Sequence, residues 1–278
     1  MSSEKTGIQN SAEGKRPKGL PSGKIGLAFV IPGLAALFFA VVKNSNVLAF
    51  IGLSLTFWGA LFYFIRPVRY VQGSLLDSTV HSTYMTIDRI INDLKLKTKA
   101  YYIPPYPMDV YLPEHLKGLK EAAVFISGGK EGTPSVEDLA KSKFMIQNPS
   151  GVCVAPPGSG LLSQVEKELR KETSKLQLSE LYECLPSVIV ENLELAKEAE
   201  MREESGKIYL KLSDSVYRRL YSAEANLKSV HFLGCPIVSA VACAIAKSTG
   251  KPAAIQKIKT TYDGQTVEVW YQIVEVTA

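Results

Sequence analysis

The side chains best suited to chemistry lie near the C-terminal end of this 278-residue chain. Cys235 follows Gly234 at the predicted start of a helix over 234–250, and His231 comes four residues before Cys235. Because a helix N-terminus lowers the pKa of a thiol, and an imidazole can act as its base, the pair is a candidate nucleophile. Free cysteines are also common as small buried residues, so the interpretation we favour is packing ahead of the helix.

Two glycine-rich turns are candidate anion-binding sites. Gly158-Ser159-Gly160 precedes a helix predicted over 161–172, whose first N–H groups can bind a phosphate. Ser127-Gly128-Gly129-Lys130 follows an apolar strand. A P-loop needs Lys and Ser or Thr after its last glycine, whereas Leu161 follows the first turn and the second lacks the spacing. We therefore favour a structural turn over an anion-binding site for each segment.

No cofactor or metal site is predicted. The chain has four cysteines and three histidines, and their order contains no Cys-x-x-Cys pair and no zinc spacing. The sequence also lacks the dinucleotide, Gly-x-Ser-x-Gly and His-Glu-x-x-His fingerprints. The absence of these patterns favours a non-enzymatic function. An enzymatic function would depend on Cys235 as the reactive group.

Two long apolar runs dominate the N-terminal part of the chain. They lie between Ile25 and Ile65, contain no Asp, Glu, Lys, Arg or His, and are joined by Lys43–Asn46. Each has about the 17–25 residues that span a bilayer, and both are apolar on every face, whereas surface helices keep a polar side. The sequence predicts a two-pass transmembrane hairpin over 25–66 in preference to core helices or a cleaved signal peptide.

Small side chains recur every four residues along both runs. They predict the contact stripe of the hairpin, because small residues let two backbones approach closely in lipid. The stripe comprises Ala28, Pro32, Ala36 and Ala40 on the first helix and Gly52, Thr56 and Ala60 on the second.

The cations around the hairpin predict its orientation. Both flanks are basic and the connecting turn holds a single lysine; the flanking cations are Lys15, Arg16, Lys18, Lys24, Arg66 and Arg69. Because Lys and Arg accumulate on the cytoplasmic side, both termini are predicted to be cytoplasmic at the cell membrane. The same six cations can bind anionic lipid headgroups.

The remainder of the chain predicts one soluble α+β domain. An apolar stripe at helical spacing predicts an amphipathic helix over 75–96, which packs on the domain or against a second copy. Short strands are expected at 101–103, 109–112, 122–126, 143–147, 152–155 and 207–212, and helices at 161–172, 178–204, 216–221 and 234–250. The last helix is expected to be buried at the centre. Asp263-Gly264 predicts a hairpin between strands over 254–262 and 266–276, on an antiparallel sheet with one covered face.

These elements predict four parts: a disordered basic tail over 1–24, the hairpin over 25–66, a linking helix over 67–98, and a cytoplasmic domain over 99–278. The net charge of +5 forms no basic stripe, so no nucleic-acid partner is predicted. The function that fits is a membrane-anchored binding or scaffold module of unknown ligand, with protein partners or self-association, or a subunit of a membrane complex. The alternative is a membrane-surface enzyme that uses Cys235 and an anion-binding turn.

Overall fold

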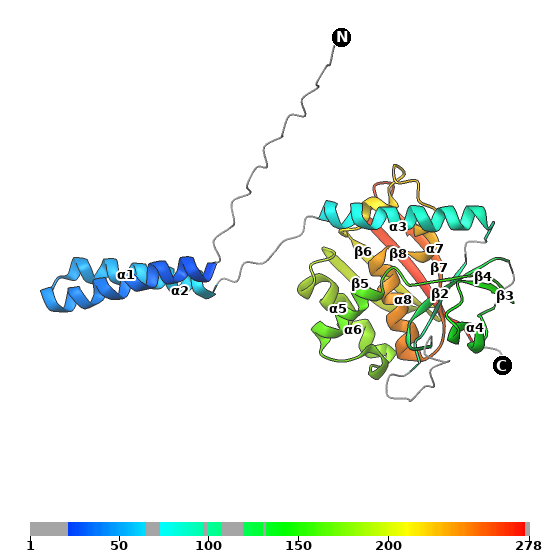
Figure 1. The fold of residues 1–278 in the computed structure, drawn as a ribbon, viewed down its shortest axis with the longest axis horizontal. Helices are drawn as coiled ribbons and strands as arrows, with labels where there is room; N and C mark the ends of the chain where they lie inside the picture. The colour runs from blue at the N-terminus through cyan, green and yellow to red at the C-terminus, as the bar shows by residue number, and fades with distance from the viewer. Residues whose placement is uncertain (1–21, 65–72, 97–98, 107–118, 130–131, 276–278) are drawn as a thin grey trace, which may run out of the picture. The chain divides into compact units, whose positions relative to one another are not determined.

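The computed structural model describes residues 22–64, 73–96, 99–106, 119–129 and 132–275 (Figure 1). The chain divides into two compact units, residues 1–70 and 71–278. The tail predicted over 1–24 lies outside the described residues up to position 21, and positions 22–24 belong to the first helix. The strand predicted at 109–112 lies outside them entirely.

The first unit is a helical hairpin of α1 (Ser22–Lys43) and α2 (Asn46–Phe64). Asn44 turns the chain with a φ of 46°. The helices approach most closely at two glycines. A Cβ on Gly33 would lie 2.7 Å from the backbone nitrogen of Thr56, and one on Gly52 would lie 2.9 Å from the carbonyl oxygen of Gly33. Only hydrogen atoms in place of side chains allow the two backbones this separation.

The contact stripe of the hairpin differs from the predicted one on α1. Gly52 is buried and Thr56 is half-buried on α2, as expected. On α1, however, Ala28 and Pro32 are exposed, and Gly33 makes the close contact. Ala36 is half-buried and Ala40 is buried, as expected, so the predicted stripe on α1 is wrong in its first half only.

One helical stretch of the described residues, Val230–Thr249, is long and apolar enough to cross a membrane, and 89% of it is buried inside the second unit. This stretch is the core of the domain, as the sequence predicted. The apolar stretches of the hairpin, Leu27–Lys43 and Asn46–Phe62, are shorter. Helix length alone therefore does not establish the two-span topology.

The second unit is built on an eight-stranded sheet with the order β3-β4-β2-β1-β7-β8-β6-β5, in which all neighbours are antiparallel. The predicted α+β class with an antiparallel sheet is confirmed, including the hairpin of the last two strands. The strands are β1 (Ala100–Ile103), β2 (Ala123–Ser127), β3 (Met145–Gln147), β4 (Ser150–Val154), β5 (Glu198–Glu204), β6 (Lys207–Ser213), β7 (Ala253–Thr260) and β8 (Thr266–Ile273).

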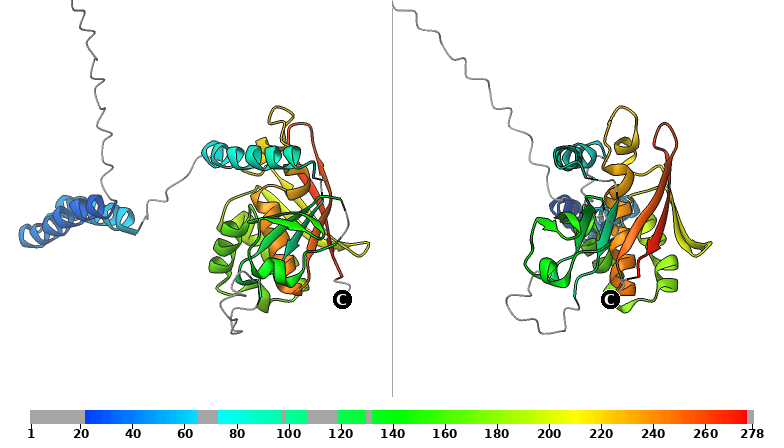
Figure 2. Two further views of the ribbon diagram at one scale, coloured as in Figure 1. Left: turned by 45° about the vertical axis from the view of Figure 1, so that its right-hand side comes forward. Right: turned by 90° about the vertical axis from the view of Figure 1, so that its right-hand side faces the viewer.

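Helix α8 (Pro236–Thr249) lies along one face of this sheet and carries the centre of the core. Helices α5 (Ser159–Leu169) and α6 (Leu178–Ser187) pack on α8, and α6 also contacts the edge strand β5. Small side chains between Ile237 and Ala246 let neighbouring elements approach α8 closely, and they are almost fully buried. The sheet, α8, α5 and α6 therefore share one core, and Figure 2 gives two further views of this arrangement.

Helix α3 (Gly73–Asp93) belongs to the second unit and is the linking helix predicted from its apolar stripe. Tyr84, Ile87 and Ile91 on this stripe are buried in the core of the domain. The carboxylate of Asp88 accepts backbone hydrogen bonds from Lys228 at 2.8 Å and Ser229 at 2.7 Å. The apolar face of α3 is thus packed on the domain, which is the first of the two roles predicted for this helix.

The long helix predicted over 178–204 is wrong in its second half. Helix α6 ends at Ser187, a π-helical turn, η3, covers Val188–Asn192, and Glu198–Glu204 forms the edge strand β5. Glu-rich segments favour helices in isolation, but seven-residue pairing with β6 buries Met201 and decides the structure. The charged outer side chains suit an edge strand, since they discourage pairing with another molecule.

The outer face of the sheet, opposite α8, has two different halves. Over β6 and β8, the rings of Tyr209 and Trp270 are 5.2 Å apart, and Arg202 and Lys259 lie over them. The other half carries a small apolar cluster, and Leu139 of helix α4 (Val136–Ala140) lines a pocket at the border of this cluster. The cluster consists of Tyr101, Phe125, Ile146 and Ala254, with Ile103, Cys153 and Val274 at its border.

Candidate functional site

Cys235, the candidate nucleophile, is completely buried. Burial raises the pKa of its thiol, although hydrogen bonding to Tyr221 and backbone N–H groups of α8 opposes the rise. His231, on α7 (Val230–Leu233), is exposed, and its ring lies 6.3 Å from that of Tyr221. The geometry therefore favours a structural role for Cys235, because its thiol is buried while the imidazole of His231 is exposed to solvent.

Three buried tyrosines donate hydrogen bonds to the backbone on either side of Cys235. Tyr102 donates a hydrogen bond to the carbonyl of Leu233 at 2.5 Å, and Tyr84 donates one to Gly234 at 2.5 Å. Tyr271 donates a third to Val238 at 3.0 Å. Burial raises the pKa of all three tyrosines well above 10, so the hydroxyls stay protonated donors. Tyr102 and Tyr84 thus satisfy buried carbonyls of the turn between α7 and α8, and Tyr271 binds the first turn of α8.

The turn at Gly158 is used for packing. The N–H of Gly158 donates to the hydroxyl of Ser239 at 2.9 Å, and the N–H of Ser159 donates to Pro156 at 3.1 Å. A Cβ on Gly158 would lie only 2.2 Å from the backbone nitrogen of Ala240, whereas Gly160 faces open space. Two of the three N–H groups expected to bind an anion are therefore engaged within the protein.

The second turn has the same character. The N–H groups of Ser127, Gly128 and Gly129 donate to Lys99 at 3.0 Å, to Ser150 at 2.7 Å and to the hydroxyl of Ser127 at 3.2 Å, respectively. Lys130 lies outside the described residues. All three N–H groups of this turn are therefore engaged within the protein. Anion binding at either turn stays a sequence prediction.

A polar groove runs between α3, η4 (Arg218–Tyr221) and the β7–β8 turn. Asp77 lies on its wall and is 7% exposed. Burial raises the pKa of this carboxyl, while Arg219 and His81 partly offset the rise. Acidic and basic side chains alternate around the groove, which gives no single charge for a ligand to recognise. Among the described residues, no group of three His, Cys, Asp or Glu side chains could hold a metal ion.

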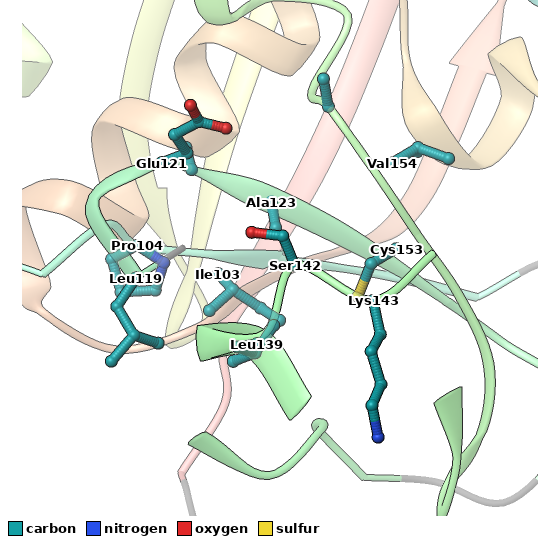
Figure 3. Close-up of a pocket in the computed structure, with 12 residues that line it drawn as sticks. Ile103, Pro104, Leu119, Glu121, Ala123, Leu139, Ser142, Lys143, Cys153 and Val154 are labelled. Carbon is teal, nitrogen blue, oxygen red and sulfur yellow. The ribbon is translucent and has the colours of Figure 1, made fainter. Parts of the chain in front are cut away.

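A more sharply defined cavity lies on the apolar half of the outer face (Figure 3). This outer-face pocket has a volume of about 170 Å³. Its floor is made by side chains at the ends of β1, β2 and β4, and its wall by α4 and the turn that follows it. The lining residues are Ile103, Pro104, Leu119, Glu121, Ala122, Ala123, Leu139, Ser142, Lys143, Cys153, Val154 and Ala155.

The charged side chains of the outer-face pocket point away from its interior. Figure 3 shows the ammonium group of Lys143 and the carboxylate of Glu121 directed outward, while the hydroxyl of Ser142 faces the cavity. The Nζ of Lys143 forms an ion pair at 2.7 Å with the carboxylate of Asp138, which lies outside the pocket. The pocket is therefore mixed in character: apolar side chains form its floor, and polar groups stand at its rim.

Cys153 is the one thiol in this pocket. Burial, with a smaller effect from the nearby Asp138 carboxylate, raises its pKa to about 11. At neutral pH it is a protonated thiol that adds apolar surface. The pocket could not be predicted from the sequence, because its residues come from five short segments between positions 103 and 155. Only the strand packing brings them together, and no local motif marks them.

Alkylation of the cysteines should follow their burial. At pH 8, Cys153 in the folded protein is expected to react with iodoacetamide at least about 100-fold more slowly than a free thiol, because its thiolate fraction is small. Its rate should rise tenfold per pH unit up to about pH 11. Cys235 and Cys243 should react only after unfolding. Mass spectrometry of labelled peptides measures each rate, and a Cys235 that reacts faster than Cys153 would restore the nucleophile hypothesis.

The comparisons with known proteins bear on family alone. No curated protein and no solved structure is detectably similar to this chain. A family model described as a domain of unknown function, DUF7982, matches residues 9–271, which include both the hairpin and the α+β domain. The chain therefore belongs to the DUF7982 family of domains of unknown function.

Proposed function

We propose that this protein is a membrane-anchored module. In this proposal the α1–α2 hairpin lies in the bilayer, and the α+β domain of residues 71–278 acts as a scaffold or receptor on the cytoplasmic side. The support comes from the surface of the hairpin, its length and the charges beside it. Catalysis is the less favoured alternative, because the thiol it would use is buried.

The observation that carries the proposal is the apolar exposure of the hairpin. Phe38 is 69% exposed, Phe50 73% and Phe57 63%. These side chains point outward from both helices, together with exposed leucines, isoleucines and valines along the same lengths. Soluble monomers rarely expose contiguous apolar patches beyond a few hundred Å². A lipid environment covers a pair of helices that is apolar on all sides.

The dimensions of the hairpin fit a bilayer. Helices α1 and α2 contain 22 and 19 residues. At a rise of about 1.5 Å per residue they reach about 33 and 29 Å, close to the ~30 Å hydrocarbon core. The shorter apolar stretches, Leu27–Lys43 and Asn46–Phe62, are at the lower end of the spanning range, which bilayer thinning and flanking cations accommodate.

The basic flanks support a cytoplasmic location of both termini. Lys15, Arg16 and Lys18 precede α1 and Lys24 lies in its first turn, Arg66 and Arg69 follow α2, and Lys43 is the one cation beside the connecting turn. These cations are also the groups proposed to bind anionic headgroups. A subunit role in a membrane complex and self-association are compatible with the same anchor, and detergent-extracted protein running as a monomer would argue against both.

Alkaline carbonate extraction tests the anchor. Full-length protein is expected to stay with the vesicle pellet. A Leu34→Lys/Phe57→Lys variant should be released more readily, because each charge in the apolar region costs about 2.5–3.5 kcal/mol. The matched control Leu75→Lys/Met85→Lys places the same charges at exposed positions of the second unit and should leave retention unchanged.

Two outcomes would overturn the proposal. Release of the unmodified protein by carbonate would remove the anchor. Digestion of the α+β domain by protease added to intact cells would place the domain on the opposite side of the membrane.

A further inference from the structure

We propose that the polar groove between α3, η4 and the β7–β8 turn binds a small zwitterion, a free molecule that carries one ammonium group and one carboxylate group. Asp77 receives the ammonium group, and Arg219 receives the carboxylate group. The inference rests on the receptor role proposed above and deepens it by naming a ligand class. Its binding test is independent of the membrane anchor.

The carboxylate of Asp77 is the observation that carries this inference. Asp77 is only 7% exposed, and its Oδ1 atom is shielded from solvent without a hydrogen-bond partner among the described residues. Buried polar groups are nearly always hydrogen-bonded, and an unpaired buried charge is strongly unfavourable. Because Asp77 also lines the groove, an ammonium group bound there lies against this carboxylate and supplies the donors that it lacks.

Two basic side chains line the groove close to Asp77. Burial raises the pKa of the Asp77 carboxyl, and the charges of Arg219 on η4 and His81 on α3 lower it, so both groups are near enough to act on it. Within the described part of the chain, neither side chain forms an ion pair or a hydrogen bond with Asp77. The guanidinium of Arg219 is exposed and has its donors available for a carboxylate. A ring N–H of His81 is a second donor on the same side.

The other charged groups of the groove are less suited to a ligand. Arg218 is paired with Asp214, and the carboxylate of Asp263 accepts hydrogen bonds within its own turn. Glu224 is exposed, so water screens its charge.

The pair of charges that remains selects a molecule with both signs. A simple anion is repelled by the carboxylate of Asp77, and a simple cation is repelled by the guanidinium of Arg219. A zwitterion is attracted at both ends, and each contact is a charge-assisted hydrogen bond. The mixed charges that give no single sign to the groove are therefore the feature that gives it selectivity.

Saturation-transfer NMR on the full chain in phosphatidylcholine nanodiscs tests the proposal. The probes are glycine, β-alanine and 4-aminobutyrate, which separate the same two charges by different lengths. The best of the three is expected to bind with a dissociation constant of about 1 mM, within reach of so small a ligand. Acetate and methylamine each carry one of the two charges and should bind at least about tenfold more weakly.

Asp77→Asn separates a ligand-binding role from a structural one. The substitution keeps the size of the side chain and removes the buried charge, so the melting temperature should stay the same or rise. Binding of the best zwitterion should weaken about tenfold or more, because a charge-assisted hydrogen bond is lost. Asp93→Asn is the matched control, since Asp93 is an exposed carboxylate on the same helix outside the groove, and it should leave binding unchanged.

Arg219→Gln examines the other end of the ligand. Binding of the zwitterion should weaken about tenfold, whereas the weak binding of methylamine should not fall, because methylamine has no carboxylate to lose a partner. Arg89→Gln, at an exposed arginine of α3 outside the groove, is the matched control and should leave both affinities unchanged.

The proposal is overturned if none of the three zwitterions binds at about 20 mM, twentyfold above the expected dissociation constant. It is also overturned if acetate or methylamine binds as tightly as the best zwitterion, or if Asp77→Asn binds like the wild type. Loss of zwitterion binding in nanodiscs of phosphatidylethanolamine, whose headgroup carries an ammonium and a phosphate, would overturn the assignment to a free molecule. None of these results depends on carbonate extraction, so failure of the ligand site and failure of the anchor are distinguishable.

Discussion

Replacing Gly158 with alanine is expected to lower the free energy of unfolding of the α+β domain by about 3 kcal/mol or more, one of the largest single-site effects in this chain. The added Cβ would lie 2.2 Å from the backbone nitrogen of Ala240 and 2.4 Å from the carbonyl oxygen of Pro236. Both atoms belong to the backbone of α8, so a rotamer change cannot relieve the overlap. The loop must move away from the helix and give up the hydrogen bond from Gly158 to Ser239.

Gly160→Ala is the matched control two residues later. A Cβ at Gly160 meets no atom within 4 Å, and alanine is the better helix former by up to about 1 kcal/mol. Stability should therefore be unchanged or slightly higher. Urea unfolding of the full chain, followed by the fluorescence of Trp270 in a Trp58→Phe background, measures both variants. Equal stabilities would show that Gly158 does not make the close contact with α8.

The second large effect is expected at Glu166, whose carboxylate joins three elements. Its Oε1 atom lies 2.8 Å from the Nζ of Lys247 on α8 and accepts hydrogen bonds from the N–H and hydroxyl of Thr173 at 2.8 and 2.7 Å. The Glu166 and Lys247 side chains are only 18% and 16% exposed. Glu166→Ala should cost about 2–4 kcal/mol, because it leaves the ammonium of Lys247 and the donors of Thr173 without their acceptor.

Glu168→Ala is the control for this variant. Glu168 is an exposed carboxylate on the same helix, and its removal should change stability by less than about 0.5 kcal/mol. A Glu166→Met/Lys247→Met double variant should recover much of the loss, since it removes both members of the pair. Equal effects of Glu166→Ala and Glu168→Ala would contradict the structural role of this ion pair.

The same ion pair predicts a dependence of stability on pH. Burial raises the pKa of Glu166. The hydrogen bonds from Lys247 and Thr173, together with the positive charge of Lys247, lower it by more, so the pKa lies below 4.5 in the folded protein. A depressed folded pKa contributes stability that is present above the unfolded value and lost as the pH falls through the folded value. The stability difference between wild type and Glu166→Gln should therefore shrink below about pH 4.5. A difference that stays constant from pH 7 to pH 3 would contradict the lowered pKa.

Local patterns predicted the parts of this fold that are locally determined. The β7–β8 hairpin follows from Asp263-Gly264, which suits a tight turn between β-rich runs. Helix α8 follows from Pro236 in its first turn and Gly250 after its end, where φ is 65°. The small side chains between them predicted its burial. In each case, residues close in sequence contain the whole physical cause.

The helix predicted over 178–204 failed in its second half because distant residues decide the structure there. Glu198–Glu204 has the composition of a solvated helix, and it becomes a strand because β6 pairs with it. At two candidate sites the sequence left alternatives, and distant residues favour the structural one. Cys235 is buried by packing in which Tyr84 and Tyr102, 151 and 133 positions earlier in the chain, bind the adjacent turn. The N–H of Gly158 donates to Ser239, 81 positions later.

By itself, the sequence determined the apolar hairpin, the antiparallel α+β class, the central helix and the last β-hairpin, because hydrophobic period and turn chemistry act over a few residues. The tertiary structure alone decided which side chains share a site. Packing buries the thiol of Cys235, and hydrogen bonds within the protein engage N–H groups of the two glycine turns. Packing also assembles the outer-face pocket from the ends of three strands, α4 and the 119–121 segment. Such sites depend on strand order and packing between residues far apart in the chain, for which a single sequence carries no local signal.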